Sequence, residues 1–204
     1  MKKQLTCVLA QFGLPFGVIK QKGFWQTLGV NPKAKNLRAE SMGYLPFHFD
    51  FDQATEPPEG IALFCLRPDA LGGGESIVFD YQRFFELLSE EQFAELSAIT
   101  YSYSTLYNVN GIGELYNPHP LIQPNFKGSA IFRYNGRVAP ELDEDKAELF
   151  RVLESSFIKA STTCTLSSGD MIVCNQLKTL HGRLPLAPRA VSYTHLRAHE
   201  TSNH

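Results

Sequence analysis

The stretch IALFCLRPDALGGGESIVFD, residues 61–80, decides the predicted fold. Its apolar run IALFCLRP predicts a buried strand, and GGGESIVFD predicts a turn followed by a second strand. Asp80 can cap a short helix over residues 81–88, and Ser89 begins a capping-box pattern for another helix over residues 90–99. Two strands followed by two short helices are therefore expected here.

Outward from this stretch, further strand signals appear toward the C-terminus. The aromatic and hydroxyl alternation of YSYSTLYNV, residues 101–109, predicts a strand. The segment SAIFRYNGRV, residues 129–138, predicts strand, turn and strand, with Asn135-Gly136 at the corner. TCTLSSGDMIVCNQ, residues 163–176, predicts a β-hairpin. These signals favour a β-rich fold.

A longer helix is predicted between these strand signals. Asp143, Glu144 and Asp145 suit its N-terminus, and its predicted apolar face consists of Leu149, Phe150, Val152, Leu153 and Phe157. The first forty residues lack a clear period and predict loops with short elements. The predicted strands and helices do not alternate regularly, as they would in a parallel α/β fold, and no internal repeat is found. We therefore expect an all-β core with helical insertions.

Composition narrows the classes of function. In 204 residues, 43% are apolar, which suits one domain, and 19 basic against 21 acidic side chains give a net charge of −2. This near-equal number of basic and acidic residues gives no excess positive charge of the kind that binds nucleic acid or an anionic membrane surface. The four cysteines stand singly and predict free thiols. With neither a signal-peptide pattern nor a membrane span, a cytoplasmic protein is expected.

The sharpest chemical feature is His48-Phe49-Asp50 within GYLPFHFDFD. In a strand, side chains two residues apart point to the same face, so this imidazole and this carboxylate can bind one metal ion. The pair alone also fits an ordinary exposed strand, so a third ligand is needed.

His181, 133 residues later in GDMIVCNQLKTLHGR, is the preferred third ligand. The adjacent Gly182 lets the backbone pack closely while the imidazole points inward. His119, between two prolines, is a weaker candidate. Two histidines and one carboxylate on one face of a metal leave three positions open, as in non-haem Fe(II) oxygenases.

These motifs, together with GGGES at residues 72–76, resemble those of the Fe(II)/2-oxoglutarate-dependent dioxygenases of the taurine dioxygenase (TauD/TfdA), clavaminate synthase-like family. The resemblance implies a double-stranded β-helix, or jelly roll, over residues 1–189. It implies Fe(II) held by His48, Asp50 and His181, with 2-oxoglutarate and O2 as co-substrates. It also implies contacts from Ser76 and Arg189 to 2-oxoglutarate.

The sequence departs from the family at two places. Cys174-Asn175-Gln176 replaces the usual Asp-Asn-Arg before the distal histidine, which loosens any inference about the substrate. Residues 190–204 do not continue the family pattern and resemble a translated sequencing-adaptor tail. A non-native tail and a C-terminally truncated jelly roll are therefore expected, with Arg197 as the alternative anchor for 2-oxoglutarate and a chain of weak or no activity.

The function implied is hydroxylation or desaturation of a small anionic or zwitterionic metabolite. Asp50 supports this, since related halogenases lack that carboxylate. Arg133, Tyr134, Arg183 and Asn110 are candidates for the substrate pocket by position. Two alternatives stay open: a non-catalytic jelly-roll module that binds a ligand or partner, and a metal-dependent isomerase or hydrolase on the same barrel. Nothing in the sequence determines the oligomeric state.

Overall fold

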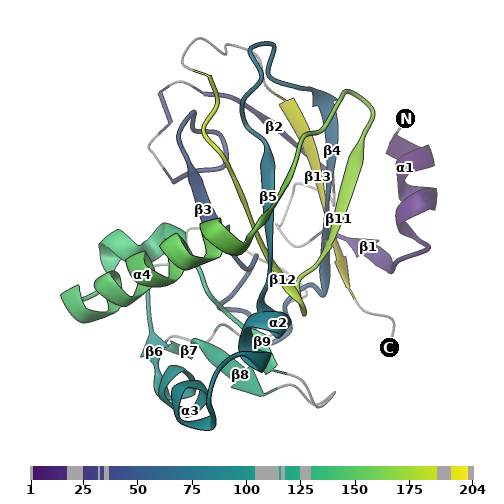
Figure 1. The fold of residues 1–204 in the computed structure, drawn as a ribbon. Helices are drawn as coiled ribbons and strands as arrows, with labels where there is room; N and C mark the ends of the chain where they lie inside the picture. Colours follow the sequence, from purple (N-terminus) through teal and green to yellow (C-terminus); the bar gives the residue numbers. More distant parts are fainter. Residues whose placement is uncertain are drawn as a thin grey trace.

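The computed structural model describes residues 2–17, 25–31, 33–34, 37–103, 115, 118–124, 130–187 and 194–201. Its centre is a pair of antiparallel sheets that face each other (Figure 1). One has five strands and the other four, and side chains from both line a cavity. This layout agrees with the expected all-β core.

The five-stranded sheet has the order β1-β13-β4-β11, with β2 also paired to β13. Its strands are β1 (Leu14–Phe16), β2 (Gln26–Gly29), β4 (Gly60–Arg67), β11 (Met171–Asn175) and β13 (Thr194–Thr201). The four-stranded sheet has the order β10-β5-β12-β3. Its strands are β3 (Leu45–His48), β5 (Ser76–Asp80), β10 (Thr162–Cys164) and β12 (Thr179–Arg183).

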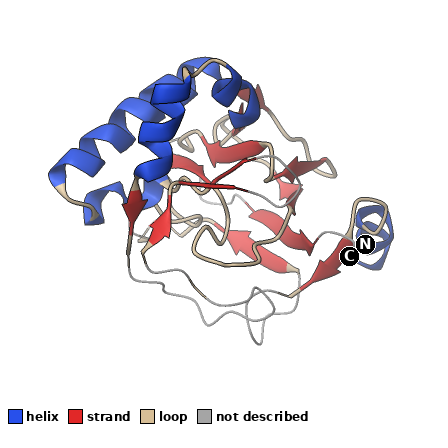
Figure 2. Cartoon of the chain, turned by 90° about the horizontal axis from the view of Figure 1, so that it is seen from below, coloured by secondary structure: helices blue, strands red, loops and turns tan. Residues whose placement is uncertain are grey.

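Two short ribbons and the helices complete the fold. The ribbons pair β6 (Thr100–Tyr101) with β7 (His119–Pro120), and β8 (Ile122–Pro124) with β9 (Ala130–Phe132). The helices are α1 (Lys2–Leu9), α2 (Tyr81–Glu86), α3 (Glu90–Ala98), α4 (Glu144–Ala160) and the 3-10 helix η1 (Gly136–Glu141). Helices α2, α3 and α4 gather on one side, and α1 stands apart on the other (Figure 2).

The deciding stretch folds as predicted, because its signals are local. Its two apolar runs form β4 and β5, and the Asp80 side chain accepts hydrogen bonds from the first amides of α2. The predicted capping box at Ser89 is present at the start of α3. However, β4 and β5 do not pair with each other, since each belongs to a different sheet. The turn between them therefore carries the chain from one sheet to the other.

The prediction of a hairpin over residues 163–176 is wrong. Strand β10 pairs with β5, whereas β11 pairs with β4 in the opposite sheet. A turn at Gly169, with φ of +98°, does lie between them, as the Ser-Gly signal indicates. The local pattern identified the turn but could not indicate which partners the flanking strands would find.

The prediction for residues 129–138 is correct only in its first half. Strand β9 forms, but Asn135-Gly136 begins the 3-10 helix η1 instead of a hairpin corner. The Asn135 side chain accepts a hydrogen bond from the backbone N–H of Arg137, so the residue acts as a helix cap. Among the residues predicted as a strand over 101–109, Tyr101 ends β6, and residues 104–109 lie outside the described part of the chain.

The core is an aromatic cluster between the four-stranded sheet and the helices. As predicted, helix α4 begins after Asp143 and buries Phe150, Leu153 and Phe157. The prediction is wrong for Val152, which is exposed, and Leu149 is only partly buried. Phe157 stacks on Phe79 of β5, with ring centroids 4.3 Å apart. Phe47 of β3 packs edge-on against both of these rings. This packing holds β3 and β5 firmly against α4.

Strand β13 occupies a position that the sequence did not predict. Residues 194–201 pair with β4 on one side and with β1 and β2 on the other. Main-chain hydrogen bonds need no particular side chains, so a segment without apolar alternation can still fill this position. The prediction that residues 190–204 are a non-native tail is not tested by this pairing and stays a prediction.

All four cysteines are free thiols, as the sequence predicts. Cys65 and Cys174 are buried, and Cys7 is exposed. Within the described ranges, none of the helices combines the length and apolar character that crossing a bilayer requires.

Candidate metal centre

Two neighbouring strands bring the predicted histidines together. His48 ends β3 and His181 lies in the middle of β12, and their Cα atoms are directly paired in the antiparallel ladder. The two imidazole centroids are 4.3 Å apart. A Cβ on Gly182 would lie 2.7 Å from the carbonyl oxygen of Leu45, which confirms that this glycine allows the close approach of the two strands.

Asp50 reaches the histidines by a different route from the one predicted. Strand β3 ends at His48, so Asp50 lies in the turn that follows and not on the same strand face. The next residue, Phe51, has φ of +59°, in the left-handed region that a non-glycine residue seldom adopts. This turn directs the carboxylate toward the imidazoles, so the prediction that the side chains converge is correct although its geometric basis is not.

The three side chains form one compact donor set. The Nε2 atom of His48 lies 3.6 Å from Oδ1 of Asp50, and the Nε2 atom of His181 lies 3.6 Å from Oδ2. One ligand atom from each residue lies within 4.8 Å of the others. All three side chains are buried. An ion can therefore be shared by two imidazole nitrogens and one carboxylate oxygen.

Both imidazoles are held in the state that binds a metal. The Nδ1 atom of His48 lies 2.8 Å from the carbonyl oxygen of Pro46, and because a carbonyl only accepts, Nδ1 carries the proton and Nε2 is left as the ligand atom. Burial, with a further effect of the positive charge of Arg137, lowers the pKa of His181 to about 3. His181 is thus neutral at physiological pH, as a metal ligand must be.

A cavity between the two sheets adjoins the donor set. It is lined by both histidines, by Ser76 at the start of β5, and by apolar side chains that include Leu63, Val78 and Ile172. Ser76 is thus in the same cavity as the metal ligands, where the resemblance expects a contact to 2-oxoglutarate. Arg189, the other expected contact, lies outside the described residues.

Two of the predicted pocket residues have structural roles instead. The Arg133 guanidinium is completely buried and donates to the backbone carbonyls of Asp52 and Ala54. The Tyr134 hydroxyl donates to Glu154 of α4, at 2.6 Å. Neither side chain lines the cavity.

Arg183 does line the cavity, but three backbone carbonyls, those of Ala39, Ser41 and Gly43, accept its N–H groups. It therefore anchors the segment before β3. Asn110, the remaining candidate for the substrate pocket, lies outside the described residues.

Sequence reasoning missed two residues that hold the turn of Asp50. The side chain of Gln176 is fully buried, and its Oε1 accepts a hydrogen bond of 2.7 Å from the backbone N–H of Asp50. Asp52 is buried beside the turn, where His119 lies 3.1 Å from its carboxylate. His119 is thus a partner of Asp52 and not a member of the metal group. In the sequence, the only sign of this role was that Gln176 departs from the family pattern.

The donor set suits Fe(II). Two imidazoles and a carboxylate on one side of an ion leave further coordination positions for other ligands, the arrangement of non-haem Fe(II) oxygenases. Zinc in structural sites would instead have four protein ligands, and among the described residues only three ligand side chains gather here.

Comparison with known proteins agrees with this geometry. The model of the family described as "Taurine catabolism dioxygenase TauD, TfdA family" matches residues 16–198. Enzymes of this family use Fe(II), 2-oxoglutarate and O2. No curated protein sequence matches the chain.

Solved structures show the same fold. An asparagine oxygenase in complex with Fe(II), 3-hydroxyasparagine and succinate superimposes with a TM-score of 0.78 at 20% identity, over 98% of this chain and 64% of that one. The non-heme iron oxygenase OrfP, in complex with Fe and alpha-ketoglutaric acid, gives 0.73 at 17% identity, over 99% and 64%. The PvcB protein from Pseudomonas aeruginosa gives 0.67 at 18% identity, over 97% and 70%.

The chain spans slightly less than two thirds of the first two of these proteins, and the low identities establish the fold alone. The family model, in contrast, covers most of the chain and includes all three candidate ligands, His48, Asp50 and His181. The chain therefore belongs to the taurine catabolism dioxygenase TauD, TfdA family.

Proposed function

We propose that this chain is an Fe(II)- and 2-oxoglutarate-dependent oxygenase that hydroxylates or desaturates a small anionic or zwitterionic metabolite. The observation that carries the proposal is the convergence of His48, Asp50 and His181 at one end of a cavity between the sheets. A non-catalytic binding module would have no physical reason to bury two imidazoles around a carboxylate.

With iron bound, 2-oxoglutarate and O2 supply the oxidation: the co-substrate loses CO2 to become succinate, and one oxygen atom enters a C–H bond of the substrate. The residues of this chain would hold the metal and orient the substrate beside it. The hydrogen bond from His48 to Pro46 fixes which nitrogen faces the metal. The apolar cavity wall at Leu63, Val78 and Ile172 excludes water from the reacting groups.

Two residues are proposed to bind 2-oxoglutarate. Ser76 lines the cavity together with His48 and His181, so its hydroxyl can donate a hydrogen bond to a carboxylate there. Arg189 is the proposed partner of the far carboxylate, for which the paired N–H groups of a guanidinium are well suited. The alternative partner is Arg197, whose Cα in β13 is paired with that of Leu63 in the cavity wall.

Amino-acid metabolites support the proposed substrate class. The asparagine oxygenase was crystallised with 3-hydroxyasparagine, and OrfP with (3S)-hydroxy-L-Arg. Each of these ligands is small and zwitterionic. The Asp50 carboxylate in the donor set favours hydroxylation or desaturation over halogenation.

The C-terminal segment bears on activity. We propose that residues 190–204 stand in for a native final strand. The family carries an arginine near position 195, which is His here, and Arg189 or Arg197 would replace it imperfectly, so that the chain is a weak enzyme. Replacing them with a family-like final strand should tighten 2-oxoglutarate binding. A loss of 2-oxoglutarate affinity on deleting residues 190–204 would contradict this proposal.

Anaerobic titration with Fe(II) tests the proposed function directly. We expect one Fe(II) per chain, and a charge-transfer absorption band when 2-oxoglutarate is added. The same protein in air should then release succinate, faster with a substrate than without. A chain that takes up no metal would be the non-catalytic module, whereas metal binding with no response to 2-oxoglutarate would favour the isomerase or hydrolase.

A further inference from the structure

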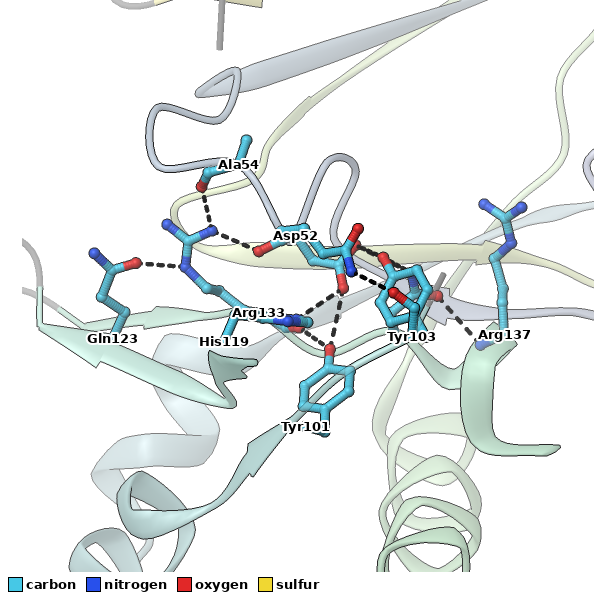
Figure 3. A network of polar contacts seen from close by, with 10 residues as sticks. Asp52, Ala54, Tyr101, Tyr103, His119, Gln123, Arg133 and Arg137 are labelled. Carbon is cyan, nitrogen blue, oxygen red and sulfur yellow. Dashed lines mark hydrogen bonds and ion pairs between the residues drawn. The ribbon is translucent and has the colours of Figure 1, made fainter. Parts of the chain in front are cut away.

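The second buried carboxylate of the metal-binding turn belongs to Asp52, two residues after Asp50 (Figure 3). Its Oδ2 lies 3.1 Å from Nε2 of His119 and 3.1 Å from the Tyr101 hydroxyl, whose single proton is shared with the nearer carbonyl of Arg133. Its Oδ1 accepts from the Tyr103 hydroxyl at 2.6 Å and from the Asn135 amide at 3.1 Å. Because a carboxylate only accepts, the proton of His119 resides on Nε2.

Asp52 is therefore surrounded by four polar side chains, which use most of the acceptor capacity of its carboxylate. It is absent from the donor set of the metal centre. The donors come from separate parts of the chain: Tyr101 ends β6, His119 begins β7, and Asn135 precedes η1. Asp52 thus connects the turn to three elements outside the two large sheets.

The backbone of the same turn is also held from several sides. The Arg133 guanidinium donates to the carbonyls of Asp52 and Ala54, at 2.5 and 2.6 Å (Figure 3). The Ala54 amide donates to the carbonyl of Phe51, whose left-handed conformation is costly for a non-glycine residue. Such conformations persist only where the surrounding contacts determine them strongly.

Asp50 differs from the two histidines in what supports it. His48 and His181 lie on paired strands of one sheet, whereas Asp50 lies on the turn. On one side of Asp50, Gln176 holds its backbone amide, and on the other side the chain passes through Phe51 into Asp52. The position of the metal-binding carboxylate therefore depends on contacts made by its neighbours.

From this arrangement we infer that Asp52 is a positioning residue for Asp50: the hydrogen bonds of its carboxylate fix the turn that presents the third ligand to the metal. The inference rests on the proposed function, because it assumes that Asp50 binds the ion. It predicts that a change at Asp52 weakens metal binding although Asp52 does not touch the metal. Contacts that orient ligands in this way commonly affect metal affinity by about 10- to 100-fold.

The test is an anaerobic titration with Co(II), whose visible absorption reports both affinity and coordination geometry, on the full chain. Asp52→Asn should raise the Kd for Co(II) about tenfold and change the Co(II) spectrum. The matched control is Asp69→Asn, another buried carboxylate, which accepts hydrogen bonds from the amides of Leu71 and Ala187 away from the metal. It should lower the melting temperature without changing the Kd or the spectrum.

Tyr103→Phe removes a single donor to Asp52 and supplies the answer if Asp52→Asn does not fold. It should raise the Kd about threefold, which is the effect of losing one hydrogen bond of about 0.7 kcal/mol. Wild-type Kd and spectrum in both variants would overturn the inference while leaving the proposed function intact. If the wild-type chain binds neither Co(II) nor Fe(II), the proposed function and the inference fail together.

Discussion

Two carboxylates lie close to strand β3, the half-buried Glu154 and the buried Asp50, and their surroundings differ. Glu154 of α4 accepts three short hydrogen bonds, from the Tyr44 hydroxyl at 2.5 Å, the Tyr134 hydroxyl at 2.6 Å and the backbone N–H of Phe47 at 2.8 Å. Asp50 instead faces two imidazole nitrogens, each at 3.6 Å.

This difference shows that burial alone does not identify a functional carboxylate. The short contacts of Glu154 join α4 to β3, so Glu154 belongs to the scaffold. The two contacts of Asp50 to imidazoles are longer than ordinary hydrogen bonds and leave room for an ion between the three side chains. The kind of partner and its distance distinguish the two roles.

The largest effect is expected from removing a ligand. His48→Ala, Asp50→Ala and His181→Ala should each abolish stoichiometric Fe(II) binding, because two remaining ligands cannot hold the ion in competition with water. Anaerobic titration measures this. Asp50→Ala retains weak binding if chloride fills the vacated position, so succinate release decides that case. Full metal occupancy and activity in these variants would refute the triad.

The next largest effect concerns the scaffold carboxylate. Glu154→Ala removes the acceptor of the Tyr44 hydroxyl and of the Phe47 amide, and it leaves the Tyr134 hydroxyl only the carbonyl of Phe150, at 3.0 Å. The free energy of unfolding should therefore fall by about 3 kcal/mol. Denaturant unfolding measures the loss. The Kd for Fe(II) in the variant that remains folded should change little. If metal binding were lost while stability stayed the same, the contrast between the two carboxylates would be broken.

A smaller effect is expected in the cavity beside the metal. Ser76→Ala should raise the apparent KM for 2-oxoglutarate about tenfold and lower kcat less, because a lost hydrogen bond to a bound carboxylate costs on the order of 1–3 kcal/mol. Steady-state succinate assays separate the two constants. Ser97→Ala, outside the cavity lining, is the control and should leave both unchanged. An unaltered dependence on 2-oxoglutarate in Ser76→Ala would remove Ser76 from the site.

The smallest effect is a dependence of stability on pH. Burial raises the pKa of Glu154, against the opposing effect of its hydrogen bonds from Tyr134, Tyr44 and Phe47. A carboxyl whose pKa is higher in the folded state contributes stability at low pH that is lost as pH rises through that raised pKa. Wild type should therefore lose stability relative to Glu154→Gln as pH rises from about 4 toward neutrality. A parallel pH dependence in the two proteins would contradict the raised pKa.

Much of the fold followed from local sequence signals. The capping residues Asp80, Ser89 and Asp143 begin helices where predicted, because a cap needs only the next three backbone amides. Strand partners were not predictable in the same way. The segment over 163–176 contributes to both sheets, since pairing depends on distant strands that offer a free edge.

For the candidate site too, the sequence predicted some features and not others. Ligand type was evident from the sequence, and His48, Asp50 and His181 do converge. The prediction that Asp50 lies on the same strand as His48 was wrong, because β3 ends at His48. The left-handed conformation of Phe51 could not be predicted, since phenylalanine seldom adopts it.

The sequence by itself therefore determined the chemistry of the donors, the helix starts and the family. Only the tertiary structure decided that His48 pairs with His181, that Arg133 binds backbone carbonyls, and that polar side chains from distant segments surround Asp52. The physical reason is the separation along the chain of the residues that interact. Caps and turns depend on interactions within a few residues, whereas a buried polar network depends on which distant segments folding brings into contact.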